Sequence, residues 1–259
     1  ILSTLTPEAC NLLTSREDSA DLLEKLFKSN LFIQPLDEQF RYYRYHSLFA
    51  ELLRNRLNRL PLAEVQKLHL LAAEACRKEG LLQQSLQHSL TAKNYHAVLD
   101  LLVENIWHWI NHTPAADIEG WLAQLPPELQ NSQPRLLLGL GWLYLMRGNF
   151  ARLNSIIQHL QTILADSETA SAEWVALKAE FLALQANFLQ VQQQYQQAIQ
   201  LAEHSLRLIQ NGNERIAALA YLALGAGHRQ AGNYEMARMA LEKAISLSRK
   251  LDDSVTDIL

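Results

Sequence analysis

One set of side chains in the sequence could hold a metal ion. Glu104, His108 and His112 are spaced four residues apart, which places them on one face of a single predicted helix that begins at residue 97. Zinc takes carboxylate and imidazole ligands of this kind, but its sites need three or four ligands that converge. Histidines in helical repeats more often pack half-buried between helices. We therefore expect no metal site in this chain.

No other motif in the sequence supports catalysis. Gly139, Gly141, Gly225 and Gly227 fall inside predicted helices and do not follow strands, so close helix packing explains them better than a nucleotide loop does. The sequence contains no GxxxxGK[ST], GxSxG or HExxH motif. Its two cysteines are far apart and form no disulfide framework or metal knuckle, which fits a reducing compartment. We expect a cytoplasmic protein segment that is not an enzyme.

Charge and hydropathy exclude two further classes of partner. Lysine and arginine number 23 against 27 for aspartate and glutamate, a net charge of −4, and neither sign forms a long block that would bind a nucleic acid backbone. The apolar runs are far shorter than the roughly 20 residues of a membrane span. The sequence opens at Ile1 without methionine or a basic leader, so we expect a fragment of a larger protein.

The first sixty residues combine helical and β signals. Thr6 and Pro7 are typical of a helix start, and residues 19–28 carry leucines on one face. Two β-rich runs, residues 31–36 and 40–45, predict a hairpin, and leucines at helical spacing follow up to Pro61. The order helix, helix, hairpin, helix predicts a winged-helix-like domain over residues 1–60.

Internal repeats follow, over residues 61–259. Residues 147–150, RGNF, align with residues 231–234, AGNY, and the small and apolar residues around both turns match. A weaker copy surrounds Gln193, and an earlier one surrounds Gly80. Antiparallel helix pairs with a period of roughly 40 residues stack into an α-solenoid of tetratricopeptide-like hairpins. The fold class is therefore mainly all-α, although residues 95–134 do not fit the repeat register.

The repeat register predicts an inner wall made by the first helix of each pair. Six polar or aromatic side chains occupy this wall: Arg135, Trp142, Glu180, Asn187, Gln190 and Arg229. Such a mixture suits a polyhydroxylated or amphipathic small ligand, or an extended peptide. Ordinary solvation of a groove explains the same residues equally well. Trp107, Trp109 and Trp121 could stack on a sugar ring, but a place in the core is the more frequent role of tryptophan.

Residues 31–37, LFIQPLD, and 43–49, YRYHSLF, resemble a signature of the large bacterial MalT-type regulators of the LuxR family. Further similarity lies in residues 68–90, around Trp121 and at residues 134–137, so it covers most of the chain. The resemblance implies a nucleotide-binding domain before a winged helix, then a superhelical sensor of tetratricopeptide-like repeats, then a helix-turn-helix domain. This chain would comprise the winged helix and part of the sensor.

The resemblance also implies a role for His46, which matches the histidine that approaches the nucleotide phosphate in related signalling ATPases. A plain packing role at the start of a helix is an equal alternative. Ser47 stands where the family often has a second histidine, which weakens any role for that neighbouring position. The chain holds no cofactor by itself, and ATP or ADP is expected for the full protein. Contact with DNA would come from a domain that this chain lacks.

Two hypotheses about function follow. In the preferred one, the repeats bind an inducer or a partner protein, and the winged helix couples this event to nucleotide state and to ligand-dependent self-association of the full protein. In the alternative, the repeats are a scaffold for a partner protein's peptide, with no small-molecule inducer. A hydrolase or metal enzyme ranks below both, because no acid-base constellation is recognisable.

Overall fold

The computed structural model of the chain describes residues 1–131, 133–165, 171–209 and 213–251. These residues form fifteen helices and two short strands, so the predicted mainly-α fold is confirmed. Contacts divide the chain into two compact units, Ile1–Glu104 and Asn105–Leu259. The domain boundary expected at residue 60 stays a prediction, because helices on either side of it pack together within the first unit.

The first unit begins with the predicted winged-helix order. Its elements are α1 (Pro7–Thr14), α2 (Ser19–Lys28), β1 (Ile33–Pro35), β2 (Tyr43–Tyr45) and α3 (Ser47–Leu57). β1 and β2 are antiparallel, with Ile33 opposite Tyr45 and Pro35 opposite Tyr43. Leu5 bonds to Tyr43 on the other edge of β2 through two backbone hydrogen bonds of 2.7 and 2.9 Å. The strand β2 is therefore paired on both sides, which explains why Tyr43 is buried.

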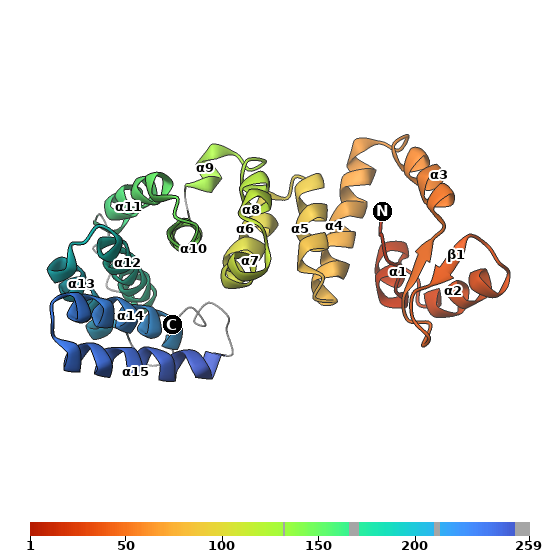
Figure 1. Ribbon diagram of the computed structural model, residues 1–259. Coiled ribbons are helices and arrows are strands. Elements are labelled where there is room, and N and C mark those ends of the chain that lie inside the picture. The colour runs from red at the N-terminus through yellow and green to blue at the C-terminus, as the bar shows by residue number, and fades with distance from the viewer. Residues whose placement is uncertain (132, 166–170, 210–212, 252–259) are drawn as a thin grey trace. The chain divides into compact units, whose positions relative to one another are not determined.

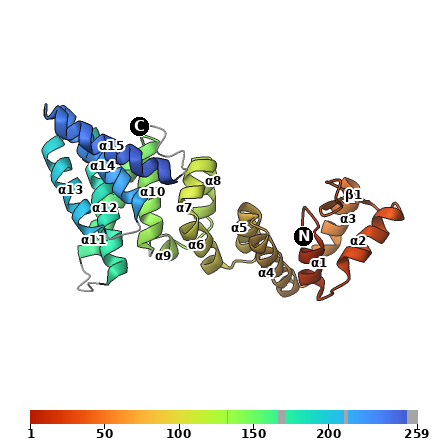
Figure 2. The same cartoon turned by 90° about the horizontal axis from the view of Figure 1, so that it is seen from below.

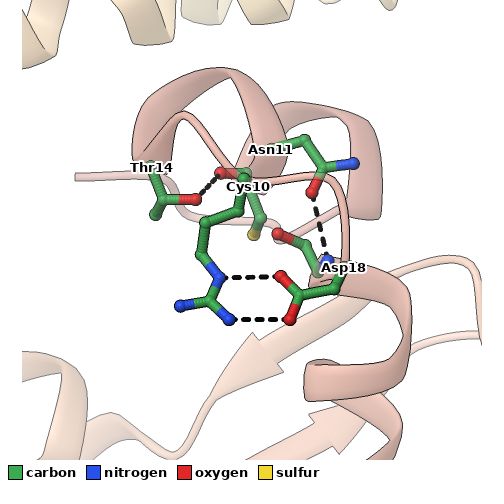
Figure 3. A network of polar contacts seen from close by, with 6 residues as sticks. Cys10, Asn11, Thr14 and Asp18 are labelled. Atoms are coloured by element: carbon green, nitrogen blue, oxygen red, sulfur yellow. Dashed lines mark hydrogen bonds and ion pairs between the residues drawn. The ribbon is translucent and has the colours of Figure 1, made fainter.

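Side-chain caps fix how the two first helices start. Thr6 Oγ1 accepts a hydrogen bond from the backbone N–H of Ala9 and so caps α1. The cap of α2 comes from α1, because Asn11 Oδ1 accepts from the backbone N–H of Ser19 at 3.1 Å (Figure 3). In the connecting turn, Arg16 forms a two-point ion pair with Asp18. A small core then forms from leucine, isoleucine and tyrosine side chains, namely Leu5, Leu23, Ile33 and Tyr43.

The rest of the first unit is helical. It contains α4 (Leu62–Lys78), α5 (Leu82–Thr91) and α6 (Tyr95–Glu104). α4 and α5 form the predicted hairpin around Gly80, and Ser85 Oγ donates to the carbonyl of Ala73 at 2.8 Å where the two helices are close. The hairpin is also tied to the N-terminal segment, since Thr6 Oγ1 donates to the Glu79 carboxylate and Ser3 Oγ donates to Gln84 Oε1.

The second unit contains the regular array. It begins with α7 (Ile106–His112), α8 (Ala115–Leu122) and α9 (Pro127–Gln130), and continues with α10 (Pro134–Met146), α11 (Phe150–Ala165), α12 (Ala172–Val191), α13 (Tyr195–Leu208), α14 (Glu214–Gln230) and α15 (Tyr234–Leu251). The expectation of one helix from residue 97 to 111 is wrong, because α6 ends at Glu104 and α7 starts anew. Asn105 breaks the helix with ψ of 24°, and asparagine favours helix ends.

Three hairpins stack in the order that the repeats predict. Each pair, α10 with α11, α12 with α13 and α14 with α15, packs closely, as Figure 1 shows for α14 and α15. The first helices also contact one another along the array, α10 with α12 and α12 with α14. Figure 2 shows α12, α13 and α14 side by side. The first helices therefore form a continuous inner wall, as a solenoid requires.

The hairpin turns share one backbone geometry. Gly148, Gln193 and Gly232 have φ of 69°, 62° and 80°, in the left-handed region. The next residue of each turn donates its backbone N–H to the carbonyl five residues earlier, at 2.9 Å in all three turns. Lys93 has φ of 57°, and Asn94 bonds to Ser89 in the same way. The α5 to α6 connection is thus a repeat-like turn that the sequence analysis did not find.

Candidate binding sites

A hollow of about 420 Å³ lies on the inner wall of the second unit. Its lining residues come from α7, from α10 and Arg147 directly after it, and from α12 and α14. The helices α10, α12 and α14 are the first helices of the three hairpins. Its lining is aromatic and aliphatic with a few amide and guanidinium groups: Trp107, Ile110, Asn111, Trp142, Leu145, Met146, Arg147, Asn187, Leu219 and Leu222. A hollow of this size and composition fits a small organic ligand.

Two tryptophans give the hollow its aromatic character. The rings of Trp107 and Trp142 are 6.0 Å apart between centroids and inclined at 43°. Trp142 is 2% exposed, whereas Trp107 is half-buried. The guanidinium of Arg215 lies over the Trp107 ring, 5.0 Å from its centroid. Arg215 thus packs against the Trp107 ring, and the part of the ring that lines the hollow offers a ligand a flat surface for stacking.

Behind the hollow, Trp142 is bonded to a carboxyl group. Its indole Nε1 donates to Glu180 Oε1 at 3.2 Å. Burial raises the pKa of Glu180 to about 7, although the hydrogen bond from Trp142 and the charges of Arg135 and Arg215 act in the opposite direction. Glu180 therefore changes its charge near neutral pH, next to a tryptophan that lines the hollow.

Two predicted wall residues use their amide groups inside the protein. Asn187 Nδ2 donates to the carbonyls of Ala183 and Leu219, at 2.9 and 3.0 Å. Gln190 Nε2 donates to the carbonyl of Ala223 at 2.9 Å. These bonds fasten α12 to α14. Because both N–H groups of the Asn187 amide are used, this residue offers the hollow an acceptor, its Oδ1.

The structure brings some of the predicted wall residues together and leaves others apart. Trp142 and Asn187 line the hollow, and Glu180 is bonded to Trp142. Arg135 forms an exposed ion pair with Glu173 at 3.4 Å, and Arg229 is exposed near the end of α14. The other lining residues were not among the predicted wall residues, and Trp107 was considered only as one of three tryptophans that could stack on a sugar ring. The lining residues of α7 lie in the stretch that could not be registered to the repeat, so no sequence signal placed them on the inner wall.

His46 lies in a second hollow, of about 480 Å³, within the first unit. Basic and polar groups line much of it, including Arg44, Arg54, Gln34 and Ser47. His46 is the residue before α3, and its side chain makes no capping bond to that helix. Two guanidinium groups, an imidazole and the N-terminal end of a helix form a surface that favours anions.

The three residues that the sequence analysis weighed as metal ligands do not share one helix, and they fall in different units. Glu104 ends α6 and pairs with Arg77 at 2.6 Å, whereas His108 and His112 are exposed on α7, with ring centroids 4.9 Å apart. In the described ranges, no three histidine, cysteine, aspartate or glutamate side chains are grouped so that they could hold a metal ion. Among the described helices, none has the length and apolarity to cross a bilayer.

Two regions of the chain match models of known families. Residues 1–65 match the MalT winged helix domain, and residues 179–250 match a tetratricopeptide repeat. The HTH-type transcriptional regulator MalT of Klebsiella pneumoniae is 29% identical over 144 residues, which is 56% of this chain and 16% of that relative. This chain therefore corresponds to a small share of the relative's length. The resemblance predicted from the sequence is confirmed: the chain resembles a segment of a MalT-type regulator, with a MalT-type winged helix domain at its start and tetratricopeptide repeats toward its end.

Proposed function

We propose that this chain is the sensor segment of a MalT-like transcription regulator, in which the repeats bind an inducer and the winged helix transmits that event to a nucleotide-binding domain. The similarity to a transcriptional regulator and the presence of both a winged helix and repeats support the class of protein. In such a protein, nucleotide and DNA would be bound by other domains, in the cytoplasm. The full protein would self-associate when ligand is present.

The hollow on the inner wall is the observation that carries the ligand-binding part of this proposal. Its volume of about 420 Å³ lies in the usual range for small-molecule sites. Trp107 offers a flat apolar surface, while Asn187 offers an acceptor and Arg147 offers donors. The preferred ligand is a small molecule with an apolar face and a few hydroxyl or similar polar groups.

The second hollow supports the nucleotide contact of His46. The lining side chains of Arg44, His46 and Arg54 come from β2, the residue after it and α3. A phosphate group of ADP or ATP bound to a neighbouring domain would find two guanidinium groups beside the imidazole. Arg54→Ala should therefore weaken binding of inorganic pyrophosphate, measured by the shift of the His46 imidazole signals in NMR. Arg56→Ala, on the same helix but outside this hollow, is the matched control, and equal effects of the two changes would count against the site.

A continuous set of contacts supports the coupling role of the winged helix. β2 precedes His46 and is bonded at Tyr43 to Leu5. The next residue, Thr6, donates to Glu79 at the end of α4. A change in nucleotide state that moved His46 would thus reach the first helical hairpin through backbone and side-chain hydrogen bonds. Ligand can bias such a change only if it binds the two states differently.

Calorimetric titration of the chain against a panel of sugars and metabolites tests the ligand-binding part. We expect one class of compound to bind, and Trp107→Leu to weaken that binding at least ~10-fold through the lost stacking surface. Trp174→Leu, at a half-buried tryptophan of α12 outside the hollow, should leave it unchanged. Binding of an extended peptide, with no response to any small compound, would instead support the scaffold function.

Hydrogen exchange tests the coupling. In the full protein, inducer should change the protection of residues 40–75, which include β2, α3 and the first part of α4. Unchanged protection there, with inducer bound, would contradict the proposed transmission through the winged helix.

A further inference from the structure

A third hollow, of about 640 Å³, lies on the opposite face of α10 from the inner wall. α10 contributes Leu137, Leu140 and Tyr144 to this hollow, whereas Trp142, Leu145 and Met146 face the inner one. These two sets occupy opposite sides of the helix, as a period of 3.6 residues requires. α8, α9, Asn131 and α11 complete the hollow, and it falls where the irregular segment meets the regular array.

An ion pair connects the two flanking helices across this hollow. Arg152 of α11 contacts the carboxylate of Glu119 on α8, and both residues line the hollow. Arg152 Nη1 also donates to Tyr144 Oη at 3.1 Å, and the guanidinium lies 5.5 Å from the centroid of the Tyr144 ring. Glu119 and Tyr144 thus hold the guanidinium in a fixed position. Both contacts use Nη1, so the N–H groups on Nε and Nη2 take no part in these two contacts.

The remaining lining divides into an apolar floor and amide acceptors. Leu137 and Leu140 are 3% and 7% exposed, so the floor is aliphatic. Gln130 Nε2 donates to the carbonyl of Leu125 at 2.8 Å, and Asn131 Nδ2 donates to the carbonyl of Pro127 at 3.3 Å. These bonds orient the two amides and leave their oxygens as acceptors. The hollow therefore has one fixed cation, one carboxylate, further acceptors and an apolar floor.

We infer that this hollow binds a free amino acid with an aliphatic side chain, whose carboxylate bonds to Arg152 and whose ammonium group bonds to Glu119. A zwitterion matches the pair of opposite charges without adding net charge, and its side chain covers the leucine floor. A purely anionic ligand would be repelled by the carboxylate of Glu119, and a purely cationic ligand would be repelled by the guanidinium of Arg152. The side chains of Arg152 and Glu119 are 53% and 33% exposed, and ion pairs near the surface are weak, so a ligand can insert between these two groups while Arg152 keeps its bond to Tyr144.

Titration of the chain with L-leucine, followed by NMR or calorimetry, tests this site. We expect leucine to bind detectably at concentrations up to about 10 mM. N-acetyl-L-leucine, which lacks the ammonium charge, and L-leucinamide, which lacks the carboxylate, should each bind at least ~10-fold more weakly than leucine. Arg152→Met and Glu119→Gln should each weaken leucine binding by a similar factor. Arg135→Met, which removes an exposed ion pair elsewhere in the same unit, should not.

A blocking variant separates loss of the site from loss of the fold. Gly120 lines the hollow, and a Cβ placed there would meet no atom within 4 Å. Gly120→Leu should keep the chain folded and abolish leucine binding by occupying the space. No leucine binding to the unchanged chain, binding of either blocked derivative as tight as that of leucine, or full binding of leucine by folded Gly120→Leu would each overturn the inference. None of these outcomes bears on the inner hollow, which lies on the other face of α10.

Discussion

At the scale of single residues, the turns of the array show how local geometry tolerates substitution. Gly148 and Gly232 adopt the left-handed backbone without a side chain, but Gln193 adopts it with one, at φ of 62°. In the left-handed conformation, the Cβ atom lies too close to a backbone carbonyl oxygen, so residues other than glycine are disfavoured there. The hydrogen bond from Gln194 to Leu189 and the packing of α12 on α13 hold the turn in spite of this cost.

Gln193→Gly should therefore stabilise the protein. We expect the free energy of unfolding to rise by about 0.5–1 kcal/mol, because the strain of the side chain is removed while the hydrogen bonds of the turn remain. Gln192→Gly is the control, since Gln192 has φ of −81° and gains nothing from glycine. Urea denaturation of both variants measures the effect. A loss of stability in Gln193→Gly would show that the left-handed conformation is not strained.

Glu180 is the residue whose charge should make stability depend on pH. Its carboxyl has an ordinary pKa of 4.5 when unfolded and about 7 in the folded protein. The folded state therefore binds more protons between these values, and the associated stability is full below pH 4.5 and is lost as pH rises past 7. The difference in free energy of unfolding between Glu180→Gln and wild type should therefore shift in favour of the variant by up to about 3 kcal/mol between pH 5 and pH 8. Thermal unfolding at both values measures this gain, and an equal difference at both would contradict it.

At the scale of elements, the hairpins depend on how closely two helices can approach. A Cβ on Gly225 of α14 would lie 2.6 Å from Leu241 Cγ and 3.3 Å from the carbonyl oxygen of Ala237, both on α15. A side chain at this position would require the Leu241 side chain to move, and the backbone of α15 to give way slightly. The buried alanines of the same region, Ala186, Ala202 and Ala223, allow equally close packing between neighbouring hairpins.

Gly225→Ala should destabilise the protein by about 1–3 kcal/mol, because the added methyl group overpacks the contact between α14 and α15. The energetic cost of this overpacking exceeds the stability gained from alanine's better helix propensity. Gly120→Ala supplies the matched control. It adds the same group to a helix with open space around it, so it should be neutral or stabilising by up to ~1 kcal/mol. Chemical denaturation distinguishes the two. Equal stability of both variants would mean that the α14 and α15 contact relaxes freely.

At the scale of the whole molecule, the winged helix and the first helical hairpin behave as parts of one compact unit. Thr6 is buried at 4% exposure and donates to Glu79, and Ser3 bonds to Gln84 at 3.1 Å. These bonds connect residues more than seventy positions apart, so they bypass the chain connection at Pro61. We therefore expect movement of the N-terminal segment to be transmitted to the turn between α4 and α5.

Glu79→Ala should loosen this connection without disturbing the cap of α1, which Thr6 makes with Ala9. Removal of the acceptor leaves a buried hydroxyl unpaired, at a cost of about 1 kcal/mol. Hydrogen exchange should accelerate in residues 1–14 and around the α4 to α5 turn, and stay unchanged in α14 and α15. Glu74→Ala, which removes an exposed pair with Lys78 on the same helix, is the control. Equal exchange in both variants would show that the Thr6 to Glu79 bond does not link the two parts.

The candidate site could be predicted only in part. Trp142 and Asn187 follow from the repeat register, because the inner face of a first helix recurs at fixed positions. Trp107 could not be found in this way, since it lies on α7, beyond a break at Asn105 that the helical pattern did not reveal. The pairing of Trp142 with Glu180 was also hidden, because the two residues are 38 positions apart.

The sequence by itself determined the winged-helix order, the repeated hairpins and the resemblance to MalT-type regulators. These follow from local signals: turn residues, the spacing of apolar side chains and short motifs that need no distant partner. Only the tertiary structure decided which faces of α7, α10, α12 and α14 enclose a hollow, and which charged groups meet across the other face of α10. The physical reason is that a cavity and the shifted pKa of a buried carboxyl group depend on how several helices pack together. The sequence of one helix does not determine which side chains of a neighbouring helix lie opposite it.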